Sequence, residues 1–158
     1  MPQNAVNPQV NYPTASIFKR LAAMLYDFLL ILALWLIFGI VIVALFVDMP
    51  EVGGEFQKPF PPSIAASSWF SITFLFYTYF WRRNGQTLGM QAWRIKLVSE
   101  QPGPISILQC MLRVGIGFFS VLSCGLGFLW MLWDKSEKTW HDRASMSKVV
   151  ILPKDLKK

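Results

Sequence analysis

Two long stretches of apolar residues predict the main helices of this chain. The first follows Ser16, a residue typical of helix N-termini, and continues to Val47 with no charge after Asp27. Its uncharged part would form a helix of about 30 Å, which matches the hydrocarbon core of a bilayer. The second stretch, Pro59 to Trp81, is also uncharged and ends at a pair of arginines. We therefore expect two transmembrane helices.

A third apolar region, Ile105 to Trp133, has two interpretations. A straight helix of this length would cross the bilayer once, as a third span. Alternatively, the arms Ile105–Phe119 and Leu122–Trp133 form a re-entrant or interfacial hairpin. We favour the hairpin, because the tail after this region is basic and because the alternating segments Ile95–Val98 and Lys148–Leu152 are expected to pair on the cytoplasmic face. The predicted fold class is an all-α membrane protein with a small cytoplasmic β-pair.

The charges between the apolar stretches indicate how the chain lies in the membrane. The loop Asp48 to Pro62 is mainly acidic, whereas the segment Arg82 to Pro104 is mainly basic. By the positive-inside rule, we expect the basic segment and both termini in the cytoplasm, and the acidic loop outside. The predicted parts are a Pro-rich cytoplasmic tail at 1–14, a membrane domain at 15–152 and a Lys-rich tail at 153–158.

Composition supports an integral membrane protein. The 158 residues are 54% hydrophobic and 15% charged, and their mean hydropathy is +0.41. The 15% aromatic content excludes a disordered tail, a collagen-like repeat or a coiled coil. The net charge of +6 has no nucleic-acid-binding motif beside it, so we interpret it as a topology signal. The start of the chain lacks the apolar core of a signal peptide, so we expect the first apolar segment to be a permanent anchor.

Asp27 is the main candidate for chemistry within the membrane. Arg20 lies on the same helix face but about 10 Å away along the axis, too far for a close pair. A carboxylate at the edge of the bilayer therefore needs another cation, hydrogen bonds or protonation. Asp27 either binds a proton or cation, or it acts as a structural latch or as an interface residue whose carboxylate reaches toward water. The candidate cations are Arg113, Arg143 and Lys19.

The segment Asp134 to Ser145 contains the only histidine, His141, beside Asp142. Adjacent residues do not face each other, and no nucleophile motif accompanies them, so we predict no enzyme activity. One histidine with scattered carboxylates is too few ligands for a metal site, and the cysteines Cys110 and Cys124 are expected to be buried thiols. No Walker-type, dinucleotide or zinc-protease motif is present, and we expect no cofactor.

Three segments, in this order, resemble the RDD family of small bacterial membrane proteins. Arg20 to Asp27 resembles the pattern R-x-x-A-x-x-x-D, with Ala23 in place. Gly85–Met90 resembles the loop motif G-x-T-x-G-K, with methionine in place of the usual lysine. Thr139 to Ser145 resembles the terminal H-D-x-x-(A/S) motif. The positions carried over are Arg20, Asp27 and Asp142, which give the family its name, and the loop residues Gly85, Thr87 and Gly89; Arg113, His141 and Arg143 are supporting candidates.

The resemblance implies a multi-pass protein of the bacterial inner membrane, for which transport is one hypothesis. Asp27 would bind an ion or proton, while Arg20 and Asp142 would set its pKa and access. Two or three spans enclose no pathway, so this hypothesis needs a homo-oligomer. Its interfaces would use the small residues of the second span or Gly115, Gly117, Gly125 and Gly127.

The alternative is a non-enzymatic membrane partner, an assembly factor or a lipid-interacting protein, with anionic lipids attracted to the basic surface. In either case, an ion pair between Arg20 and Asp142 would dock the C-terminal tail on the first helix.

Overall fold

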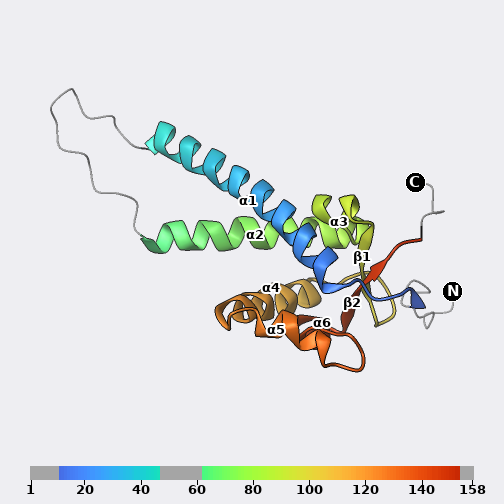
Figure 1. The fold of residues 1–158 in the computed structure, drawn as a ribbon. Coiled ribbons are helices and arrows are strands. Elements are labelled where there is room, and N and C mark those ends of the chain that lie inside the picture. The colour runs from blue at the N-terminus through green and yellow to red at the C-terminus, as the bar shows by residue number, and fades with distance from the viewer. Residues whose placement is uncertain (1–10, 47–61, 154–158) are drawn as a thin grey trace.

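The computed structural model describes residues 11–46 and 62–153. The acidic loop that the sequence places between the two long helices lies outside these residues, as do most of the N-terminal tail and residues 154–158. The described part is mostly helical and contains one small sheet (Figure 1).

Two long helices, α1 (Ile17–Phe46) and α2 (Pro62–Asn84), form the extended arm of the molecule in Figure 1. Within the described residues, α1 alone is long and apolar enough to cross a membrane by itself, over Ile17–Ile42. The expected second span is a helix of 23 residues, but it does not pass the same test. Its many Ser, Thr and Tyr hydroxyls and its two terminal arginines lower its hydropathy. The described residues therefore contain one candidate membrane span where the sequence predicts two transmembrane helices.

The third apolar region folds as a broken helix. A capping box between Ser106 and Gln109 starts α4 (Ile107–Leu122), and α5 (Leu126–Leu129) and η2 (Trp130–Leu132) follow. The two parts are bent by 110°, which fits a broken span or a re-entrant loop. The break comes three residues later than the predicted end at Phe119, because the helix continues until the chain turns at Ser123 to Gly125.

The expected β-pair is present. Strands β1 (Ile95–Ser99) and β2 (Ser147–Ile151) are antiparallel, with Leu97 opposite Val149. Residues just before α1 add to the other edge of β2, where the Ala15 N–H donates to the carbonyl of Val149 at 2.9 Å. The chain between the two strands therefore leaves the sheet and returns to it. The residues that lead into α1 lie beside β2, so α1 begins at the sheet.

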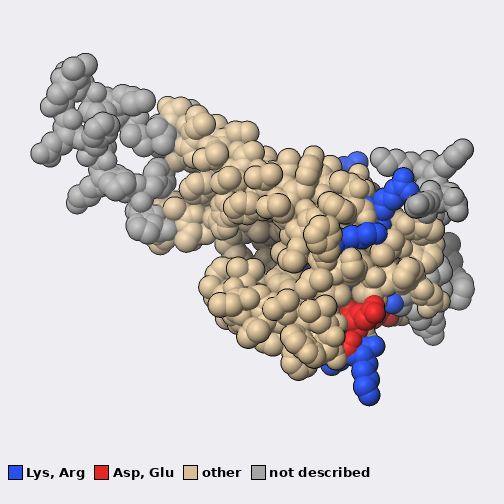
Figure 2. Space-filling model, in the orientation of Figure 1, with Lys and Arg blue, Asp and Glu red and all other residues tan. Residues whose placement is uncertain are grey.

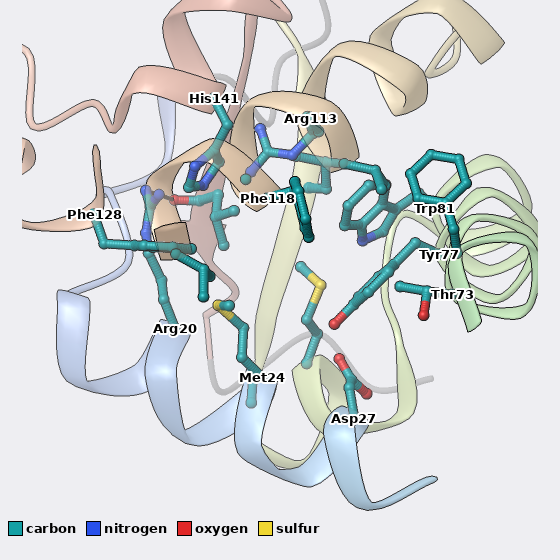
Figure 3. A pocket seen from close by; sticks show the side chains of 18 of the residues that line it. Arg20, Met24, Asp27, Thr73, Tyr77, Trp81, Arg113, Phe118, Phe128 and His141 are labelled. Carbon is teal, nitrogen blue, oxygen red and sulfur yellow. Dashed lines mark hydrogen bonds between the residues drawn. The ribbon is translucent and has the colours of Figure 1, made fainter. Parts of the chain in front are cut away.

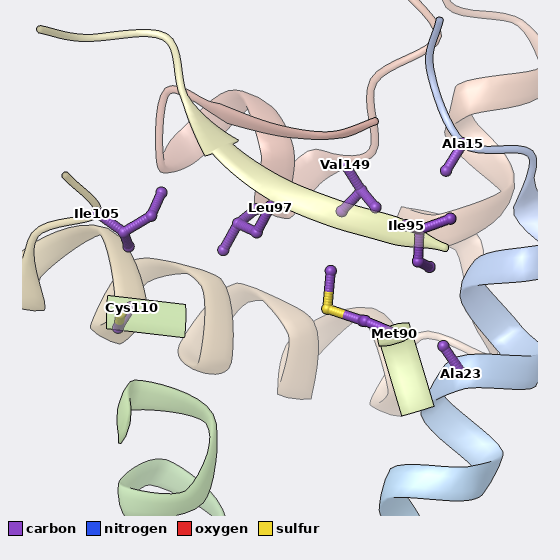
Figure 4. Packing of buried hydrophobic residues seen from close by; sticks show 8 residues of the cluster. All are labelled: Ala15, Ala23, Met90, Ile95, Leu97, Ile105, Cys110 and Val149. Atoms are coloured by element: carbon purple, nitrogen blue, oxygen red, sulfur yellow. The ribbon is translucent and has the colours of Figure 1, made fainter. Parts of the chain in front are cut away.

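The short helices connect the long ones to the sheet. Helix α3 (Leu88–Ala92) follows α2 and packs on α1, and α6 (Trp140–Ala144) packs on α4 and leads into β2. A small apolar core forms where the sheet meets α1, α3 and α4 (Figure 4). It consists of Ala15, Ala23, Met90, Ile95, Leu97, Ile105, Cys110 and Val149.

Outside this core, many large apolar side chains lie at the surface. Many residues of α1, α4 and η2 are exposed, among them Leu29, Phe119 and Leu132. Figure 2 shows that the visible charges gather at the end of the molecule that contains the sheet. The expectation of two buried thiols is wrong for Cys124, which is exposed at the break after α4, whereas Cys110 is buried.

Candidate functional site

The carboxylate of Asp142 lies between two arginines from different helices. Arg20 of α1 approaches Oδ2 to 2.5 Å, and Arg113 of α4 approaches Oδ1 to 2.7 Å. All three side chains are buried. The Arg20–Asp142 pair that the sequence predicts is therefore present, and it includes a second cation.

Several other polar atoms of this cluster bind backbone and hydroxyl groups. Arg20 Nε donates to the carbonyl of Ala15 at 3.0 Å. Arg113 Nη1 donates to Ser147 Oγ at 2.8 Å and to Ser145 Oγ at 3.4 Å. Asp142 also accepts from the backbone N–H of Thr139, within the capping box that starts α6. The cluster thus joins α1, α4, α6 and β2.

Burial and the neighbouring positive charges shift the pKa of Asp142 in opposite directions. Burial alone would raise its pKa, but the guanidinium groups of Arg113 and Arg20 outweigh this effect and hold the pKa well below its usual range. The adjacent His141 is also buried, with its ring 4.8 Å from that of Phe128 between centroids. Burial, together with the positive charge of Arg113, lowers the pKa of His141 to about 3. At neutral pH the cluster therefore contains two cations and one anion.

Asp27 forms a second buried polar contact between elements, which connects α1 to α3. We call this contact and the Asp142 cluster the two polar joints. Its Oδ2 accepts from the hydroxyl of Thr87 at 2.5 Å, and its Oδ1 accepts from the backbone N–H of Gly89 at 2.9 Å. The same Thr87 side chain caps α3 by accepting from the N–H of Met90. A Cβ atom at Gly89 would be 2.3 Å from the carbonyl oxygen of Ala23, so only glycine permits this close approach.

The loop motif Gly85–Met90 therefore does more than form a tight turn at its glycines. Gly85 ends α2 with a φ of +70°, and its carbonyl accepts from the Leu97 N–H at 2.7 Å. Thr87 and Gly89 supply the two donors for Asp27. Met90, which replaces the lysine of the family pattern, lies in the apolar core and is not needed for these contacts.

None of the predicted cationic candidates pairs with Asp27 among the described residues. Arg113 binds Asp142, and the exposed Arg143 pairs with Asp134. The described ion pairs of the chain include none for Asp27, so hydrogen bonds alone satisfy this carboxylate. The reason is geometric: the turn after α2 brings two donors closer to Asp27 than any arginine.

A cavity of about 630 Å³ lies between α1, α2 and α4 (Figure 3). Arg20, Arg113 and His141 border its end near the sheet, and Asp27 borders its wall on α1. The surface is hollowed between the corresponding parts of the molecule in Figure 2. Most of its lining is apolar or aromatic, with contributions from Met24, Trp35, Ala65, Trp69, Phe70, Met90, Val114, Phe118, Val121 and Phe128.

Sequence reasoning missed two polar residues of this cavity, Thr73 and Trp81. Both lie on α2 together with Tyr77, at intervals of four residues, so they share one helix face. Thr73 Oγ1 and Trp81 Nε1 are buried and have no hydrogen-bond partner among the described residues. The spacing of four would have revealed this polar stripe within an otherwise apolar helix.

The geometry accounts for each segment that resembles a family motif, and a comparison of the whole chain agrees. The sequence model described as RDD family matches residues 14–146. The chain belongs to the RDD family. Members of this family are generally membrane-associated, and α1 supplies this RDD protein with a helix that could cross a bilayer. No curated protein and no solved structure matches the chain.

Replacement of Asp142 by asparagine is expected to destabilise this RDD protein strongly. The change leaves two buried guanidinium groups without an anion, which typically costs about 3 to 5 kcal/mol. Asp134→Asn is the control, because its partner Arg143 is exposed and should tolerate the loss with little change in stability. Thermal unfolding of the purified variants in mild detergent measures the difference. Equal unfolding temperatures would contradict the central role of the Asp142 cluster.

The stability of the protein should fall as the pH is lowered from about 6.5. Unfolded histidine binds a proton near pH 6.5, whereas folded His141 does so only near its pKa of about 3, so acid favours the unfolded state across this interval. The lowered pKa of Asp142 adds a further loss below about pH 4. His141→Phe should remove the decline above about pH 4, as measured by unfolding at a series of pH values. A decline of the same size in this variant would mean that other groups cause it.

Proposed function

We propose that this RDD protein is a non-enzymatic membrane protein that binds a lipid-like, amphipathic molecule in the cavity between α1, α2 and α4. The observation that carries the proposal is the character of this cavity. Its lining is mainly apolar, and its cationic side chains, Arg20 and Arg113, lie at the end near the sheet. Its volume falls within the range of about 300–1,000 Å³ that is typical of ligand pockets.

The same cavity favours an amphipathic ligand over a bare ion. A small ion needs several converging oxygen ligands to replace its hydration shell. Both oxygens of Asp27 already accept hydrogen bonds from α3, and the aromatic and aliphatic side chains around them offer few further ligands. The cavity lies within one chain, so lipid binding does not depend on a homo-oligomer.

We further propose that the protein lies in a bacterial inner membrane with the sheet and both termini on the cytoplasmic side. Arg82, Arg83 and Arg94 are exposed near the sheet, which agrees with the positive-inside rule. The residues before α1 and both strands meet at this end, so α1 and α2 would cross as a pair. The exposed apolar residues of α4 and η2 would enter the membrane as a re-entrant segment.

The basic surface gives a second means of holding lipid. Arg82, Arg83, Arg94 and Lys96 would attract anionic lipids of the cytoplasmic leaflet, at about 1 kcal/mol for each charge near the surface. This attraction would bring acidic lipids close to the cavity without requiring them to enter it.

Filling the cavity should reduce the amount of bound lipid. A Cβ atom at Gly117, which lines the cavity, would meet no atom within 4 Å, so Gly117→Trp can place an indole in the free space. Gly115→Trp is the matched control, since Gly115 lies on the same helix with equal room but outside the lining. Mass spectrometry of lipids that purify with each variant should show a severalfold loss for Gly117→Trp alone. Equal lipid content in both variants would reject the proposal.

Ion or proton transport is the second candidate, and the position of Asp27 favours it. This carboxylate lies within the α1 segment that could cross a membrane, and it borders the cavity. Figure 3 shows Tyr77 directed toward the same region of the cavity as Asp27. A transport route through this chain would need a homo-oligomer to enclose it.

Asp27→Asn should abolish proton flux if transport is the function. Asparagine keeps the shape of the side chain but cannot carry the charge, so the variant should still fold and insert. Proteoliposomes that contain a pH-sensitive dye report the flux. Wild-type protein without flux above that of empty liposomes, or an Asp27→Asn variant with undiminished flux, would exclude transport through this residue.

A further inference from the structure

The end of the cavity near the sheet contains one more positive charge than its contacts neutralise. Arg20 and Arg113 share the single carboxylate of Asp142, and His141 beside them is neutral at physiological pH. An uncompensated buried charge is costly, so this end of the cavity attracts an anion. Asp27 is the other carboxylate that borders the cavity, but it lies about 10 Å along α1 from Arg20 and is bound by α3.

Hydrogen-bond donors without partners lie at the same end. The contacts of Arg113 with Asp142, Ser145 and Ser147 all use Nη1, and its buried Nε has no partner among the described residues. Trp81 Nε1 is likewise buried and unpaired, and the guanidinium of Arg113 lies 5.5 Å from the Trp81 ring centroid. Buried donors without acceptors are rare in folded proteins. Two unpaired donors on neighbouring side chains, beside an excess positive charge, point to an acceptor group supplied by a ligand.

The rest of the cavity leads away from this end along an apolar path. On α2, the lining continues from Trp81 back to Ala65, which corresponds to about 24 Å of helix. On α4, it continues from Arg113 through Gly117 to Val121. The path is long, and its cationic side chains, Arg20 and Arg113, lie at one end of it. Its length and its volume of about 630 Å³ suit a single hydrocarbon chain.

We infer that the cavity takes a single-chain amphiphile with an acidic head group, whose oxygens accept from Arg113 and Trp81 and whose chain lies between α2 and α4. The inference rests on the proposed function and adds the charge of the head group and the direction of the chain. A carboxylate and a phosphate monoester share the necessary chemistry.

Competition for a photoactivatable fatty acid tests the inference. The full-length protein is placed in nanodiscs of phosphatidylcholine at about pH 8, labelled with a diazirine analogue of palmitic acid, and challenged with oleate, lysophosphatidate or oleyl alcohol. We expect an acidic competitor to be at least about tenfold more effective than the alcohol, because hydrogen bonds to a charged acceptor are stronger than those to a neutral one. The more effective acidic competitor identifies the head group as carboxylate or phosphate.

A pair of tryptophan variants tests the position of the head group. Trp81→Phe removes the indole N–H but keeps an aromatic ring beside Arg113, and it should reduce the advantage of the acidic competitor severalfold. Trp69→Phe is the control, because Trp69 lines the apolar part of the same cavity. The ratio between the acidic and neutral competitors is measured within each variant, so a general loss of stability does not affect it.

The outcomes separate this inference from the proposed function. Equal competition by oleyl alcohol and the acidic amphiphiles, with labelling that Gly117→Trp still reduces, would overturn the acidic head group and leave lipid binding intact. An acidic preference that Trp69→Phe and Trp81→Phe reduce equally would overturn the position of the head group. Labelling that Gly117→Trp does not reduce would overturn both the proposed function and the inference.

Discussion

The buried carboxylate of Asp142 is the constraint on which the packing of this protein depends. It is bound by Arg20, which lies 122 residues earlier in the chain, and by Arg113 of the broken helix. Helices surrounded by lipid gain little from hydrophobic burial against each other, so apolar surface alone does not select one arrangement. A charge cluster selects an arrangement because each member left without its partner is costly. Asp142 therefore fixes the C-terminal segment and the broken helix against the start of α1.

The two aspartates of the family pattern make the same kind of contact in two places. Asp142 accepts from the backbone N–H of Thr139, which caps α6, and Asp27 accepts from the hydroxyl of Thr87, which caps α3. Each carboxylate thus connects a short helix to a longer element. Together the two joints fix α1 from both sides, since α3 packs on the face of Asp27 and α6 is tied to Arg20. The cavity lies between them.

The Asp142 cluster also explains why the cationic side chains of the cavity lie at one end. The groups that connect α1, α4 and α6 are charged, and they lie near the sheet, where the exposed basic residues also gather. Away from the sheet, α2 and α4 are held by aromatic and aliphatic side chains, which leave an apolar space. A ligand with an acidic head and a hydrocarbon chain complements both parts.

The sequence by itself determined what depends on local pattern. Hydropathy located the long helices, alternation located both strands, and three short motifs identified the family. It also anticipated that Arg20 would meet Asp142. It did not reveal that Arg113 completes this cluster or that Thr87 and Gly89, rather than an arginine, satisfy Asp27. It placed the break after α4 too early, and it did not identify Thr73, Tyr77 and Trp81 as a polar stripe that borders the cavity. Those features depend on contacts between segments that are distant in the chain. Only the packing of all the helices around the sheet decides which donor lies within hydrogen-bond distance of which carboxylate.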